Sequence, residues 1–195
     1  MNYVLGKNML TDDFWAGGGG RNDNADLEGL NEFTLNTDQG YLEGMFTSYY
    51  GIIYKANVVL GHVPDESEIQ KRARAEAKVF RAWSYFELIS MWGNPPLVDH
   101  ELVPSEYHKP NGTTEELWAL VEKDLTEAIN SGFLTEKANA DDKTWRITKQ
   151  FAQALQSNTR TISRCTSKGG TGTSIRSNDE GVTSITFVPC ASFNF

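Results

Sequence analysis

The sequence predicts an all-α fold, with two antiparallel helix pairs joined by long connections. Between positions 40 and 155, apolar residues recur at steps of three and four, which is the period of an amphipathic helix. Capping motifs stand directly before several of these segments. No strand-like alternation of any length appears in the same range. With 195 residues, the chain is long enough for one ordinary hydrophobic core.

Composition and charge narrow the classes of function. The chain has 26 acidic and 18 basic residues and a net charge of −8, so a phosphate backbone would be repelled and nucleic acid is not an expected partner. Its apolar runs are far shorter than the roughly 20 residues of a membrane-spanning helix. No basic-then-apolar signal segment precedes residue 20. We therefore expect either a cytoplasmic protein or a chain whose start is missing.

The first predicted helix covers residues 40–60. Asp38 is a candidate N-cap, and Gly61 and Pro64 predict the end, because glycine accepts the left-handed cap conformation and proline cannot extend the helix. The apolar stripe consists of Leu42, Met45, Phe46, Tyr49, Ile52, Ile53, Ala56, Val59 and Leu60.

The second predicted helix begins at a capping box, in which Ser67 is followed three residues later by Gln70. It runs to Gly93, where Pro95 and the next proline prevent continuation. One expected core row consists of Ile69, Ala73, Ala77, Phe80, Ser84, Leu88 and Met91, and a second of Ala75, Val79, Ala82, Phe86 and Ile89.

Two further helices follow a loop of about fifteen residues. Thr113 and Glu116 form another capping box, before a helix expected to end near Gly132. Its apolar face consists of Leu117, Leu120, Val121, Leu125, Ala128 and Ile129. Thr148 is the candidate N-cap of the fourth helix, whose core face opens with Phe151, Ala152 and Leu155.

The composition changes abruptly after residue 155. Residues 156–195 contain seven Ser and seven Thr and lack Leu, Trp, Tyr and Met, and they hold both cysteines, Cys165 and Cys190. A disulfide would be reasonable in a secreted protein, but the sequence does not decide it. We therefore divide the chain into a helical region, 1–155, and an irregular Ser/Thr-rich tail, 156–195.

Two polar residues fall within the predicted apolar helices. Asn57 lies at the polar edge of the first helix, and Arg81 lies in the most apolar stretch of the second. A buried guanidinium without acceptors costs several kcal/mol, so Arg81 is expected to pair with Glu76, Asp124 or carbonyls at a helix end. We expect Asn57 and Arg81, with the terminating Gly93 and Pro95, to serve the structure rather than a ligand.

Five segments, in order, resemble the SusD/RagB family. The signature segment is AEAKVFRAWSYFELISMWGNPPLV at 75–98. It is accompanied by TDDFW at 11–15, YYGIIYKANVVL at 49–60, TTEELWALVEKDLTEAI at 113–129 and WRITKQFAQAL at 145–155. The resemblance covers about residues 2–155 and implies a fold of tetratricopeptide-like helix pairs.

The resemblance implies a protein that binds rather than catalyses. Family members are lipid-anchored outer-membrane proteins that capture glycans or other nutrients and pass them to a TonB-dependent, SusC-like transporter, with no cofactor. A complete member would have a lipidated cysteine before residue 1 and several hundred residues after 155. We therefore expect only the N-terminal part of such a protein here, with any membrane attachment through an anchor outside this chain. A tail translated out of frame, without stable packing, would explain the break at 156, and the next reading frame of the DNA tests this.

A flexible loop supplies the chemistry that sugar binding requires, namely an exposed aromatic face and groups that bridge hydroxyls. The candidate glycan-binding residues are Trp15, Arg21, Asp23 and Asn24, which flank four consecutive glycines. The competing interpretation is that Trp15 covers the edge of the core and the glycines form an ordinary loop.

Other chemistries lack the residues they need. Gly17–Gly20 is not followed by the Lys-Ser/Thr of a phosphate loop, and the three histidines are scattered without metal-ligand spacing, so no metal site is expected. The adjacent carboxylates do not form the opposed pair of a glycosidase, so no enzyme activity is expected. Two alternatives remain: a tetratricopeptide-like module that binds a protein or peptide, and a fragment without autonomous function.

Overall fold

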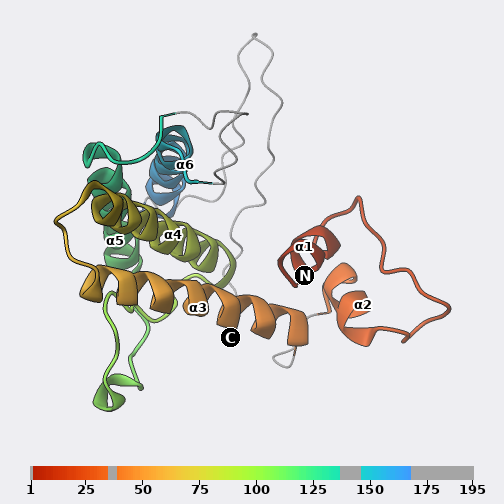
Figure 1. Cartoon of the computed structure of the whole chain (residues 1–195). Coiled ribbons are helices and arrows are strands. Elements are labelled where there is room, and N and C mark those ends of the chain that lie inside the picture. Colours follow the sequence, from red (N-terminus) through yellow and green to blue (C-terminus); the bar gives the residue numbers. More distant parts are fainter. Residues whose placement is uncertain (1, 35–38, 137–145, 168–195) are drawn as a thin grey trace, which may run out of the picture. The chain divides into compact units, whose positions relative to one another are not determined.

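The structure, a computed structural model, describes residues 2–34, 39–136 and 146–167 (Figure 1). Its α-helices are α1 (Asn2–Met9), α2 (Ala25–Asn31), α3 (Gly40–His62), α4 (Glu68–Trp92), α5 (Thr114–Asn130) and α6 (Lys149–Ser167), with one short 3-10 helix, η1 (Pro104–Glu106). The described ranges contain no strand, apart from two isolated bridges, Pro96–Asn111 and Thr135–Thr148. The predicted all-α class is therefore confirmed.

The chain forms two compact units, the first ending at Ile52 and the second beginning at Ile53. In the first unit α1 packs against α2, and in the second α5 packs against both α4 and α6. Neither α1 nor α2 was predicted. Both are short helices in a segment that contains polar residues and glycines, so their apolar periodicity is too brief to stand out.

The core of the second unit follows the predicted apolar faces. Its fully buried side chains include Val79, Leu88, Leu117, Val121 and Leu125. Leu117, Val121 and Leu125 are spaced four residues apart on α5, the helix that contacts both neighbours, and this spacing aligns them on one face. Burial of this face against α4 and α6 contributes to the hydrophobic stabilisation of the unit.

Three residues expected in the core are exposed. Ile69 is 76% exposed, Phe80 46% and Phe151 47%. Ile69 lies in the first turn of α4 and Phe151 in the first turn of α6. Phe80 follows the buried Val79, about 100° around the helix, which turns it away from that residue's packed side.

Both predicted capping boxes are confirmed. At α4, the Gln70 N–H donates to the Ser67 hydroxyl at 3.3 Å, and the Ser67 N–H donates to the Gln70 side chain at 2.9 Å. At α5, Thr113 and Glu116 make the same reciprocal pair, at 3.2 and 3.0 Å. These bonds satisfy donors that the first helical turn leaves open, so the helix starts are determined locally.

The end of α3 differs from the prediction. The helix continues through Gly61 to His62, and the Val63 N–H donates to the Val59 carbonyl at 3.0 Å. Gly61 therefore extends the helix instead of ending it. By contrast, Gly93 caps α4 with a φ of +75° and donates its N–H to the Ile89 carbonyl at 3.0 Å.

This contrast gives a matched pair of alanine substitutions. Neither a Cβ at Gly61 nor one at Gly93 would meet another atom within 4 Å, so backbone conformation dominates both effects. Gly93→Ala is expected to lower the free energy of unfolding by about 1–3 kcal/mol, because alanine disfavours this φ. Gly61→Ala is expected to raise it by up to about 1 kcal/mol. Urea denaturation followed by far-UV circular dichroism measures both, and equal effects would contradict the assignment.

The predicted boundary at residue 156 falls inside α6, which runs to Ser167. Thr159 is 1% exposed, and the Gln156 side chain donates to the Thr126 hydroxyl of α5 at 2.9 Å. Tertiary contact with α5 thus accommodates residues whose composition gave no apolar signal. Residues 168–195, including Cys190, lie outside the described part. None of the helices in the described residues is long and apolar enough to cross a membrane.

Candidate functional site

The first unit holds Trp15 on a fixed stretch of backbone. The Asn31 side chain, at the end of α2, donates to the Phe14 carbonyl at 2.8 Å and accepts from the Ala16 N–H at 3.3 Å. One amide therefore holds the residues on both sides of Trp15. The Trp15 residue itself is 78% exposed, which disagrees with the interpretation that it covers the core edge.

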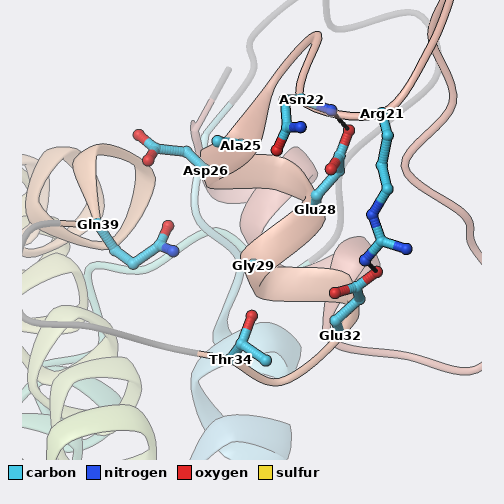
Figure 2. A pocket seen from close by; sticks show the side chains of 9 residues that line it. All are labelled: Arg21, Asn22, Ala25, Asp26, Glu28, Gly29, Glu32, Thr34 and Gln39. Atoms are coloured by element: carbon cyan, nitrogen blue, oxygen red, sulfur yellow. Dashed lines mark hydrogen bonds and ion pairs between the residues drawn. The ribbon is translucent and has the colours of Figure 1, made fainter.

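Arg21 lies in the same loop and pairs with α2. Its Nη2 donates to the Glu32 Oε1 at 2.8 Å, and Arg21 and Glu32 line one hollow (Figure 2). Glu32 directly follows Asn31, so the two contacts that order the Trp15 and Arg21 segments start from neighbouring residues. An arginine that uses one N–H in this pair still has four others for ligand oxygens.

Asp23 and Asn24 make bonds that shape the loop. The Asp23 Oδ2 accepts from the backbone N–H groups of Gly19 and Gly20, the latter at 3.0 Å. The Asn24 Oδ1 accepts from the Leu27 N–H at 3.1 Å and so caps α2. Its Nδ2 donates to the Tyr41 hydroxyl at 3.1 Å. Both side chains thereby fix the route of the glycine-rich segment into α2.

A hollow of about 270 Å³ opens beside α2 (Figure 2). Its charged lining consists of Arg21, Asp26, Glu28 and Glu32. Gln39, which directly precedes α3, also lines it and is 3% exposed. This volume lies just below the roughly 300–1,000 Å³ typical of small-molecule sites, so the hollow fits one part of a larger ligand.

The residues predicted for the site did not include Asn31, Gln39 or the three carboxylates of this region, Asp26, Glu28 and Glu32. A cap signal was available, since Asn24 is followed by acidic residues at positions 26 and 28. Recognition of α2 from that signal would have placed Asn31 and Glu32 at its end. Gln39 carried no local signal, because its proximity to α2 depends on tertiary structure.

In the second unit, Arg81 is buried and pairs with Asp124, one of its predicted acceptors. Arg81 is 7% exposed, and its Nε and Nη2 donate to the two carboxylate oxygens of Asp124 at 2.7 and 2.8 Å. Glu76, the other predicted acceptor, pairs with Arg146 instead. Burial acts to lower the pKa of Arg81, but the hydrogen bonds and charge of Asp124 leave it raised. The guanidinium is therefore fully ionised.

The same network fixes the loop after α4. The Asn57 Nδ2 donates to the carbonyls of Val98 and His100, at 3.1 and 2.9 Å, while its Oδ1 accepts from Arg81 at 2.8 Å. Arg81 also donates to the Asp99 carbonyl at 2.7 Å. Pro95 is buried at the start of this loop. The polar groups of Asn57 and Arg81 bond to protein groups, which is the geometry of a structural network rather than an open site.

The possible metal ligands are scattered over the residues that the structure describes. No group of three or more His, Cys, Asp or Glu side chains is arranged to hold a metal ion there. The His100 ring contacts Asp99 and Glu106, at 2.7 and 3.1 Å, on an exposed loop. Its pKa is raised because both carboxylates stabilise the protonated ring.

Comparison with known proteins identifies the family to which this chain is similar. Residues 6–159 match the model of a SusD-like family described as "Starch-binding associating with outer membrane". SusD-like protein P38 of Formosa agariphila is 30% identical over 100 residues, which are 50% of this chain and 20% of that protein. A SusD-like protein of Bacteroides ovatus is 25% identical over 97 residues, 46% of this chain and 18% of its own length.

Solved structures agree with the fold. A laminarin-binding SusD-like protein superposes with a TM-score of 0.73 and 32% identity, over 81% of this chain and 34% of that one. Surface glycan-binding protein A from Bacteroides thetaiotaomicron, in complex with laminarihexaose, gives 0.69 at 19% identity, over 84% and 34%. The chain thus spans about a third of these solved relatives and about a fifth of the curated ones. It belongs to the SusD-like family whose model matches residues 6–159.

Proposed function

We propose that this chain contributes to glycan capture at the outer membrane, for delivery to a TonB-dependent, SusC-like transporter, and that it performs no catalysis. Family membership supports this, as do relatives whose names or complexes include laminarin, laminarihexaose and a xylogluco-oligosaccharide. The observation that carries the proposal is the exposed Trp15 side chain on backbone held by Asn31. An indole face presented in this way can stack on the apolar side of a sugar ring with little ordering cost.

In the proposed site, Trp15 and Arg21 contact the glycan, and Asp23 and Asn24 order the loop that presents them. Trp15 provides the stacking surface, and the free N–H groups of Arg21 donate to sugar oxygens. Asp23 holds the Gly19 and Gly20 amides, which limits the conformations of the loop before binding.

Calorimetric titration with laminarihexaose tests this assignment. Trp15→Ala is expected to weaken binding at least about tenfold, or roughly 1.4 kcal/mol, because stacking is lost. Tyr107→Ala is the matched control, since Tyr107 is 65% exposed in the second unit and should leave the affinity unchanged. A chromogenic glycoside should show no turnover.

Two results would contradict the proposal. One is the absence of binding to laminarihexaose and to xylogluco-oligosaccharide, and the other is binding that Trp15→Ala leaves intact. Tight peptide binding without any effect of carbohydrate would favour the interaction-module alternative. If the glycan is delivered to the transporter, the transporter should co-purify with the complete protein from outer membranes. Failure of the two to co-purify would contradict the delivery step of the proposal.

A further inference from the structure

The hollow beside α2 has an excess of acceptor groups and of negative charge. Three carboxylates, Asp26, Glu28 and Glu32, and one guanidinium, Arg21, line it (Figure 2). Three negative charges and one positive charge give a formal charge of −2. A ligand group that donates hydrogen bonds is favoured in such a place, whereas an added negative charge is repelled.

Each carboxylate retains acceptor capacity. The Asp26 Oδ2 accepts from the Gly40 N–H at 3.3 Å, the Glu28 Oε1 from the Asn22 N–H at 2.8 Å, and the Glu32 Oε1 from Arg21 at 2.8 Å. An ionised carboxyl group has about four lone-pair sites, so each of these bonds uses only one of the acceptor sites of its carboxylate. The remaining acceptors are available to a bound group.

Gln39 provides an independent sign that the hollow accommodates a ligand. It is 3% exposed, and among the described residues its Oε1 has no hydrogen-bond partner. A Cβ at Gly29 would lie 2.7 Å from the Gln39 Nε2, so this glycine leaves the room that the amide occupies. A buried acceptor without a partner is costly and rare in folded proteins, and rotation of the Gln39 amide toward the hollow would let a ligand hydroxyl satisfy it.

We infer that this hollow binds an uncharged, hydroxyl-rich sugar unit and discriminates against glycans that carry carboxylates. The sugar hydroxyls donate to Gln39 and to the three carboxylates, while the free N–H groups of Arg21 donate to sugar oxygens. A uronate in the same position would face the net charge of −2. This inference rests on the proposed glycan binding and adds the class of glycan selected.

Laminarin and laminarin oxidised at C6 to the uronate form a suitable pair of probes, since they share linkage and backbone. We expect the 195-residue chain to bind the oxidised polymer about tenfold more weakly than laminarin. The reason is that the net charge of −2 in the solvated hollow would repel a uronate carboxylate bound there. Because these charges are solvated, 0.5 M salt should reduce the difference.

The decisive variant is Glu28→Gln/Glu32→Gln, which removes both charges but keeps an oxygen for the Asn22 N–H and for Arg21. It should bind the two polymers within about twofold of each other. Glu66→Gln/Glu115→Gln removes the same charge from exposed positions of the second unit and should keep the native discrimination. Gln39→Met should weaken binding of neutral laminarin about fivefold, as expected when one buried acceptor is lost.

The outcomes separate this inference from the function on which it rests. Loss of laminarin binding in Trp15→Ala, with equal native affinity for both polymers, would overturn the selectivity but leave glycan binding intact. Unchanged discrimination in Glu28→Gln/Glu32→Gln, or unchanged laminarin affinity in Gln39→Met, would also overturn it. No binding of either polymer by the native chain would overturn both proposals.

Discussion

Substitution of Arg81 by methionine is expected to lower the free energy of unfolding by about 3–5 kcal/mol. Arg81 donates two hydrogen bonds to Asp124, and the Asp124 residue is fully buried. Without the guanidinium, the carboxylate keeps its desolvation cost but loses its partner. The Asn57 Oδ1 and the Asp99 carbonyl lose a donor as well. Urea denaturation followed by far-UV circular dichroism measures the loss.

A second variant separates the charge effect from lost packing. Arg81→Met/Asp124→Leu removes both charges, and apolar replacements of a buried ion pair are often nearly neutral. We expect the double variant to recover most of the stability that Arg81→Met loses. A double variant no more stable than Arg81→Met would show that packing, rather than the unpaired carboxylate, causes the loss.

The deficit of Arg81→Met should depend on pH. In the native protein burial raises the pKa of Asp124, and the bonds from Arg81 act in the opposite direction. Without Arg81 only the smaller charge effect of Lys78 still opposes burial, so the pKa of Asp124 rises further and the folded state binds the proton more strongly than the unfolded state does. The stability deficit relative to the native protein should therefore shrink from pH 8 to pH 5. A deficit independent of pH would contradict this explanation.

Leu125→Ala is expected to cost about 2–5 kcal/mol. Leu125 is fully buried on α5, the helix that packs against both α4 and α6. Truncation would remove its burial free energy and leave a cavity that two flanking helices cannot close completely. Leu120→Ala, at a half-buried position on the same helix, should cost about 1 kcal/mol. Comparable losses in the same urea experiment would contradict the tighter packing of Leu125 on which this prediction rests.

The long helices were predictable because their signals are local. Each capping box forms within one helical turn, between Ser67 and Gln70 and between Thr113 and Glu116. A segment of four residues is therefore enough to predict each helix start. At the C-terminal ends of α4 and α5, Gly93 and Gly132 both have a positive φ, and the two helices end next to them as predicted. Gly61 shows the limit, since glycine permits a helix end but does not require one.

Prediction of the site was less complete. The loop with Trp15, Arg21, Asp23 and Asn24 was identified by residue type alone, which does not separate a ligand contact from a loop bond. The roles we now propose depend on partners far along the chain, such as Asn31 for the Trp15 segment and Glu32 for Arg21. No spacing rule links residues so separated unless an intervening helix is recognised.

The sequence by itself determined the all-α class, the starts of α4 and α5 and the family, since these depend on periodicity, capping and ordered motifs. Tertiary structure alone decided that Arg81 pairs with Asp124 rather than Glu76, and that α6 continues beyond residue 156. It also decided that Gln39 is buried beside α2. The physical reason is that burial and the choice of partner depend on which surfaces meet, and a local pattern carries no information about a distant surface.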